Sequence, residues 1–304
     1  MWPMEEVSRE ARQLGFIGAG KVGFSLGRHV KENGGGSYQV RGYYSRDPES
    51  ARAAAAFAGG RTFETAEELA NECDLLLLTV PDGQIQEVWR RLHGALPAGR
   101  PAESGPLFVA HCSGSLDSRV FGRSPDDDGR FSFGSLHPLV AVHDRETAYK
   151  RLGGAYFTVE GDPVFTEFAA GFLTALGNPF CLIDAKQKTL YHAASVMVSN
   201  LVCALAYEGM EAYKNCGLDG QFAGSAWRSL FLGNAENIAN LGPVAALTGP
   251  VERADTATVA RHLEVLSGEQ KEIYMLLSRT LIEAARQKNP DRDYSELESL
   301  LGKH

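Results

Sequence analysis

The sequence predicts an α/β domain built on a doubly wound, mostly parallel sheet, followed by an all-α domain. In the first part of the chain, short apolar runs alternate with helical patterns, as expected when helices join parallel strands. One run, residues 74–80, is apolar almost throughout and indicates a central strand covered on both faces. Beyond residue 184 only helical patterns remain. We therefore expect domains at residues 1–184 and 185–304.

The first apolar run leads directly into a glycine-rich turn. Residues 14–23 read Leu-Gly-Phe-Ile-Gly-Ala-Gly-Lys-Val-Gly, and a helical pattern follows. Gly18 allows a tight turn, Gly20 lets the backbone approach a pyrophosphate, and Gly23 lets the helix pack on the strand. The free N–H groups and the helix dipole favour phosphate binding there. The pattern predicts a Rossmann unit that binds a dinucleotide through Gly18, Ala19, Gly20, Lys21, Val22 and Gly23, the alternative being a glycine-rich turn with no ligand.

The end of the second strand, residues 38–44, bears on the type of dinucleotide. An NAD site usually has an acid there to hold the ribose 2′-hydroxyl. This chain has Ser45, Arg46 and Asp47, and a hydroxyl followed by a guanidinium suits a 2′-phosphate. Asp47 leaves NAD open, and Arg46 as a solvated loop charge is the other interpretation. We expect NADP.

Later strands end at the same edge of the sheet. The strand within residues 74–80 ends in Val80, Pro81 and Asp82, which we expect beside the cofactor. Strand 107–111 leads into Cys112, a further expected cofactor contact, and into small polar residues. These would grip a substrate carboxylate or the nicotinamide amide, or would simply cap a helix. The small polar residues are Ser113, Gly114 and Ser115. The strand at residues 131–139 adds His137, which is either a substrate contact or a structural histidine before a proline.

The remaining α/β segments are expected as follows. Loops are predicted at residues 97–106 and 124–130, the last strand at 154–160, and a helix at 163–176.

A long helix is expected from residue 185 to about 215, apolar nearly all round in its middle. One face carries a polar stripe at helical spacing. An enzyme that takes hydride from a bound dinucleotide needs the protein to supply a proton to the substrate, and Lys188 or His192 would supply it. We expect Lys188 to be charged with a pKa lowered by the helix dipole, and His192 to be neutral. The stripe consists of Lys188, His192, Ser195 and Ser199, with Asn200 beside it. The alternative to a substrate site is a helix end that lies in solvent.

Composition excludes several classes of protein. The 304 residues carry a formal net charge of -8, which argues against a nucleic-acid surface. Five scattered cysteines indicate neither a disulfide framework nor a metal site, and suggest a reducing cytoplasm. No signal peptide is visible, and the apolar stretch at 193–206 is too short and too polar for a membrane span. Because the long helix is apolar on several faces, we expect a homodimer through the helical domain.

Several motifs together resemble one family. They are the glycine-rich turn, residues 111–115, 136–138, 188–194, 199–200 and 246–250, and Arg253 with Asp255. The chain is similar to an uncharacterised bacterial family, in the 6-phosphogluconate dehydrogenase-like superfamily, that joins a Rossmann-like NADP oxidoreductase domain to a helical domain of unknown function. One departure is Ala254, where the family pattern has glycine. More distantly it resembles 3-hydroxyacid dehydrogenases, ketopantoate reductase and pyrroline-5-carboxylate reductase. This resemblance implies NADP chemistry on a small carboxylate-bearing substrate.

Together these features predict an NADP-dependent enzyme. It would transfer hydride to or from a small oxo, hydroxy or imino acid bound between the two domains. Arg253 would clamp the substrate carboxylate, or else form a surface ion pair with Glu252 or Asp255. The alternative function is a catalytically silent nucleotide-binding regulatory or scaffold protein.

Overall fold

The computed structural model describes residues 11–96, 105–123, 129–218 and 220–302, in two compact units. The first unit ends at Asn200 and the second begins at Leu201. The predicted boundary was near residue 184. The difference arises because helix α7 (Lys188–Met197) is anchored to the first unit: the Lys188 side chain is fully buried against strand ends of that unit. Most of the predicted loops 97–106 and 124–130 lies outside the described residues.

An eight-stranded sheet forms the first unit, and its topology confirms the predicted fold class. The strand order is β3-β2-β1-β4-β5-β6-β7-β8, and the first six strands follow the order typical of a Rossmann fold. All neighbours are parallel except β6 and β7. The strands are β1 (Arg12–Ile17), β2 (Tyr38–Tyr44), β3 (Arg61–Thr62), β4 (Leu75–Leu78), β5 (Leu107–His111), β6 (Phe131–Pro138), β7 (Phe157–Gly161) and β8 (Phe180–Leu182). Strand β8 corrects the expectation that residues 154–160 form the last strand.

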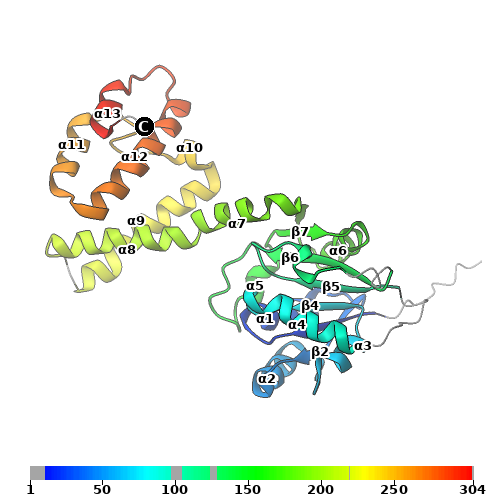
Figure 1. Cartoon of the computed structure of the whole chain (residues 1–304). Helices are drawn as coiled ribbons and strands as arrows, with labels where there is room; N and C mark the ends of the chain where they lie inside the picture. Colours follow the sequence, from blue (N-terminus) through cyan, green and yellow to red (C-terminus); the bar gives the residue numbers. More distant parts are fainter. Residues whose placement is uncertain (1–10, 97–104, 124–128, 219, 303–304) are drawn as a thin grey trace, which may run out of the picture. The chain divides into compact units, whose positions relative to one another are not determined.

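Helices cover both faces of this sheet (Figure 1). Helices α1, α2 and α6 bury their apolar faces on one side, and α3 and α4 on the other. They are α1 (Lys21–Asn33), α2 (Pro48–Ala58), α3 (Ala66–Asn71), α4 (Asp82–Ala95) and α6 (Pro163–Ala175), with the shorter η2 (Ser118–Phe121), α5 (Tyr149–Leu152) and η4 (Ala185–Gln187).

Strand β4 shows why the sheet needs both helical layers. Leu75 and Leu77 belong to one buried cluster, and Leu76 and Leu78 belong to the other. All four side chains are fully buried. Successive strand residues point to opposite faces, so a strand of four leucines must be covered on both sides. This confirms the prediction of a central strand.

The second unit is helical. Its described core is formed by α11, α12 and α13 around buried residues that include Val251 and Tyr294. Before α11, Ala254 adopts a positive φ of 57°, so the turn forms with alanine where glycine was expected. The helices are α8 (Asn200–Asn215), α9 (Gly220–Leu241), α10 (Pro243–Ala246), α11 (Thr256–Val265), α12 (Gly268–Lys288) and α13 (Ser295–Leu301).

The long helix expected from residue 185 is interrupted by a turn at Val198 and Ser199. Taken together, Ala185–Asn215 is a 31-residue helical stretch that contains an 18-residue window with a mean hydropathy of 1.4, enough by length and composition alone to cross a membrane. This corrects the expectation that the apolar stretch is too short and too polar. Within the described part of the chain, none of this apolar window is buried.

Candidate functional site

The turn after β1 has the geometry of a phosphate-binding loop. Gly18 has φ 101°, and a Cβ there would lie 2.8 Å from the Thr79 carbonyl oxygen. A Cβ on Gly23 would overlap the Thr79 hydroxyl, which donates to the Gly18 carbonyl at 2.8 Å. At Gly20 the nearest atom to such a Cβ is 3.9 Å away, so this side of the loop is open. The loop therefore packs closely on β4 through Gly18 and Gly23 and leaves room for a ligand at Gly20.

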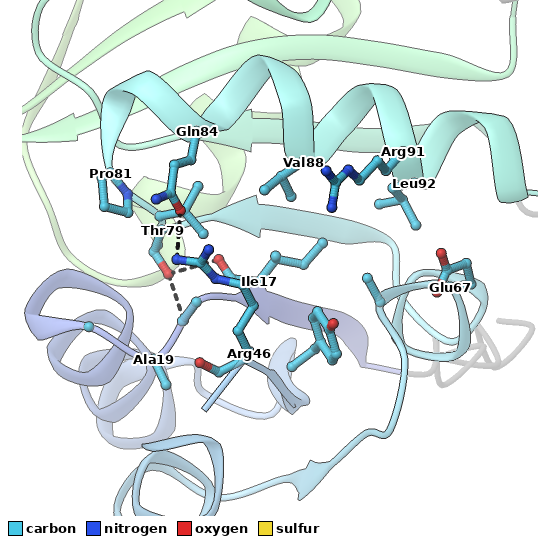
Figure 2. A pocket seen from close by; sticks show the side chains of 16 residues that line it. Ile17, Ala19, Arg46, Glu67, Thr79, Pro81, Gln84, Val88, Arg91 and Leu92 are labelled. Atoms are coloured by element: carbon cyan, nitrogen blue, oxygen red, sulfur yellow. Dashed lines mark hydrogen bonds between the residues drawn. The ribbon is translucent and has the colours of Figure 1, made fainter. Parts of the chain in front are cut away.

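A cavity of about 320 Å³ opens beside this loop (Figure 2). Residues of the loop, of the end of β2, of the end of β4 and of α4 line it. Among the predicted cofactor residues, the lining includes Gly18, Ala19, Gly20, Ser45, Arg46, Val80 and Pro81. The predicted contacts Lys21, Val22, Gly23, Asp82 and Cys112 are not among its lining residues.

The end of β2 presents a guanidinium to this cavity. Arg46 Nη2 donates to Gln84 Oε1 at 3.1 Å, and both residues line the cavity (Figure 2). Asp47, the acid that left NAD open, instead caps α2, where it accepts bonds from Glu49 N and Ser50 Oγ. Because the Asp47 carboxylate caps the helix, the side chains left at the end of β2 are the donors Ser45 and Arg46, which suit a 2′-phosphate.

A second guanidinium on the cavity was not predicted. Arg91 of α4 lines it (Figure 2). It forms an ion pair with Glu87 at 2.6 Å. Val88, Arg91 and Leu92 all line the cavity, and their spacing of three and four residues places them on one helix face. That spacing was the available sequence signal, but an arginine on a helix carries no motif.

The second predicted group, around Lys188, lies at the ends of β5 and β6. Lys188 Nζ donates to the Ser113 carbonyl oxygen at 3.0 Å and to Ser135 Oγ at 2.7 Å. Burial lowers the pKa of Lys188 to about 8, against the opposing attraction of acids led by Glu160. The direction agrees with the prediction, but the cause is burial rather than the helix dipole. At neutral pH the amine is still mostly protonated.

Two imidazoles meet over Gly114. His137 Nδ1 is 2.7 Å from the Tyr191 hydroxyl, and the His137 and His192 ring centroids are 5.9 Å apart. A Cβ on Gly114 would lie 2.9 Å from His137 Nε2 and would overlap His192 Nδ1. Burial, and then the Lys188 charge, lowers the pKa of His137 to about 4, so this ring is neutral at pH 7. His192 Nδ1 is buried and has no hydrogen-bond partner in the described part of the chain.

The loop after β5 is organised by Asp82. Ser113 Oγ and Ser115 Oγ both donate to Asp82 Oδ2, at 2.6 and 3.2 Å. Ser113 Oγ also accepts from the backbone N–H groups of Ser115 and Leu116. The two hydroxyls are thus engaged in holding the turn. Burial raises the pKa of the neighbouring Cys112 thiol to about 12, so Cys112 is not a thiolate.

The remaining predicted residues lie elsewhere. Ser195 Oγ and Ser199 Oγ donate to helix carbonyls one turn earlier, and Ser199 also bonds to the exposed Asn200. The polar stripe is therefore divided, and only Lys188 and His192 reach the strand ends. Their contacts to a ligand stay predictions.

Arg253 belongs to the second unit and is exposed. Glu252 pairs with Arg292 at 3.0 Å, and Asp255 caps α11. Within the described ranges, Arg253 forms no ion pair with either acid. Its role as a substrate clamp stays a prediction. Among described residues, no group of three or more His, Cys, Asp or Glu side chains could hold a metal ion.

Two family models match separate parts of the chain. Residues 13–100 match the family described as NADP oxidoreductase, coenzyme F420-dependent. Residues 155–281 match a domain of unknown function, DUF2520. No curated protein sequence is significantly similar to the chain.

Solved structures share the fold over nearly the full length. A Thermotoga maritima protein is 26% identical with a TM-score of 0.69, covering 90% of this chain and 99% of its own. A Bacteroides fragilis protein described as an NADP oxidoreductase is 21% identical with a TM-score of 0.67, again covering 90% and 99%. The pyrroline carboxylate reductase of Plasmodium falciparum, solved with NADP bound, is 14% identical with a TM-score of 0.54, covering 92% and 98%. The chain thus joins an NADP oxidoreductase domain to a DUF2520 domain, and it is an NADP-dependent oxidoreductase.

Proposed function

We propose that the enzyme transfers hydride between NADP and a small oxo, hydroxy or imino acid that binds over Gly114. The observation that carries this proposal is the buried, unpartnered His192 Nδ1, which faces Gly114 together with His137 Nε2. A buried polar nitrogen without a partner is costly, and a ligand oxygen or nitrogen would satisfy it.

The chain's own groups would divide the work at this site. The cofactor, when bound, supplies or accepts the hydride. His137 is neutral, and its Nδ1 is held by Tyr191, so its Nε2 is oriented to bind the substrate's carbonyl or imine group. Lys188 supplies a positive charge and a proton behind the loop, since an ammonium has three donors and two are used. A pKa near 8 suits a general acid at neutral pH.

The cofactor end of the proposal rests on Arg46 and Ser45. Arg46 and Arg91 come from different elements and both line the cavity, and Ser45 lies beside Arg46. We infer that the 2′-phosphate binds here, because guanidinium groups bind phosphate with paired, charge-assisted hydrogen bonds.

The test is NADPH oxidation with panels of 2-oxo acids, 3-oxo acids and cyclic imines. We expect turnover with at least one panel, and we expect His192→Ala to reduce it. If the protein binds NADPH but turns over no compound in any of the three panels, the proposed substrates are contradicted and a catalytically silent protein is favoured.

We also propose that the enzyme is a cytoplasmic homodimer joined through its helical unit. No side chain of α8 is buried, and Leu205, Phe231 and Leu232 are 44%, 37% and 57% exposed. A cavity of about 370 Å³ between α8 and α9 is lined mainly by apolar residues, including Trp227, whose buried Nε1 has no partner among the described residues. A second copy would bury this surface with closed symmetry. The cytoplasmic location is proposed from the five scattered cysteines of the sequence, which suggest a reducing compartment.

Light scattering of the purified chain tests the dimer. A stable monomer at micromolar concentration would contradict the dimer. Co-sedimentation of the chain with lipid vesicles would contradict the cytoplasmic location.

A further inference from the structure

The Lys188 amine belongs to a buried polar chain that no motif predicted. Lys188 Nζ donates to Ser135 Oγ at 2.7 Å, and Ser135 Oγ donates to Glu160 Oε2 at 3.3 Å. Lys188 and Ser135 are 0% exposed and Glu160 is 5% exposed. The three residues come from α7, β6 and β7, so only the folded first unit brings them together.

The Glu160 carboxylate accepts hydrogen bonds from Ser118 as well as from Ser135. The backbone N–H of Ser118 donates to Oε2 at 2.8 Å, and the Ser118 hydroxyl donates to Oε1 at 2.7 Å. With Ser135, the carboxylate receives three hydrogen bonds, which hold both of its oxygens in place. A buried ammonium and a buried carboxylate are each costly alone, and each offsets the other's cost when paired.

We propose that Glu160, acting through Ser135, is the counter-ion that positions the Lys188 amine and sets its affinity for a proton. Glu160 and Ser135 are positioning residues here, since neither faces Gly114. The inference deepens the proposed function and rests on it only where it concerns turnover.

The direction of the effect follows from the charges. Burial disfavours the ammonium, whereas a nearby carboxylate favours it, and Glu160 is the strongest of the groups that raise the Lys188 pKa. Two other nearby carboxylates have their own donors: Asp82 holds Ser113 and Ser115, and Asp117 pairs with Arg119. The charged or titratable groups around Lys188 are Glu160, Asp82, Asp117, Cys112, His111, His137 and His192.

The test measures the Lys188 pKa directly, by NMR of lysine side chains in the full-length protein, with the signal assigned from Lys188→Arg. In Glu160→Gln we expect the Lys188 pKa to fall by about 1–3 pH units, the usual effect of losing an opposite charge at this range. Glu167→Gln removes the same charge from an exposed position on α6 and should leave it unchanged. Glu160→Asp keeps the negative charge, so the Lys188 pKa in this variant should stay closer to the wild-type value than to that of Glu160→Gln. An unchanged Lys188 pKa in folded Glu160→Gln overturns the inference.

A second variant covers the case in which Glu160→Gln does not fold. Ser135→Ala removes the acceptor of the Lys188 amine and its link to Glu160 and should also lower the Lys188 pKa. No change in folded Ser135→Ala overturns the inference. On a verified substrate, the alkaline limb of the kcat profile should move down together with the Lys188 pKa. If the pKa falls and that limb stays, the counter-ion assignment holds and the proposed role of Lys188 in turnover fails.

Discussion

Replacing Lys188 with methionine should affect turnover and stability separately. Methionine keeps much of the buried volume but removes the charge and both hydrogen bonds to Ser113 and Ser135. Loss of a general acid should reduce kcat by about 10²–10⁴. Breaking a direct buried ion pair typically costs about 3–5 kcal/mol. Lys188 and Glu160 are linked through Ser135 rather than in direct contact, so we take this range as the upper bound of the loss. Such a loss is a large share of the stability of an ordinary domain, about 5–15 kcal/mol.

The double variant Lys188→Met/Glu160→Gln distinguishes the two effects. It removes both charges, and replacing a buried pair by neutral groups is often close to neutral for stability. We expect urea unfolding to show most of the lost stability restored, while kcat stays as low as in Lys188→Met. NADPH affinity should match the wild type in both variants. Full kcat in Lys188→Met on a verified substrate would refute the catalytic role, and equal stability of single and double variants would refute the pairing.

Three further predictions concern the cofactor, the loop and the response to acid. Arg46→Asp should weaken NADPH binding far more than NADH binding in fluorescence titrations, because a phosphate contact becomes a repulsion; equal losses would remove the assignment. Gly114→Ala should raise KM or abolish turnover while leaving NADPH affinity unchanged, because its Cβ would overlap His192; unchanged kinetics would show that the imidazoles can move freely. Burial, and then the Lys188 charge, lowers the pKa of His111 from 6.5 to about 4, so its contribution to stability is present above pH 6.5 and is lost as pH falls toward 4. The loss is on the order of 3 kcal/mol, and His111→Gln should unfold with a flatter pH dependence over this window.

Elements with local signals were predictable from the sequence. The strand expected at residues 38–44 matches β2, and Pro48 after the capping Asp47 marks the start of α2. The glycine-rich turn predicted the phosphate loop because its spacing reflects backbone conformation within a few residues. Strand β8 was missed because three residues carry no clear periodicity, and its pairing with β7 depends on partners more than twenty residues away.

The candidate site was only half predictable, since its key contacts are long-range. Helical spacing identified Lys188 and His192, but a spacing says nothing about what a side chain meets. From the sequence, a proton donor and a solvated helix end both stay open for Lys188, because Ser135 and Glu160, which lie beside it in the fold, are on distant strands. The expected domain boundary follows the change of composition near residue 184, whereas the compact units divide after Asn200, because α7 is anchored to the first unit.

Helix α4 connects the two halves of the candidate site. Its face carrying Gln84, Val88 and Arg91 lines the cofactor cavity, and its first residue, Asp82, holds the hydroxyls of Ser113 and Ser115. The carbonyl of Ser113 in turn accepts a hydrogen bond from Lys188. A shift of α4 on cofactor binding would therefore reach the loop over which the substrate is proposed to bind. Asp82→Asn keeps the shape of this link but weakens its charge-assisted hydrogen bonds, so it should raise the KM for substrate more than the Kd for NADPH.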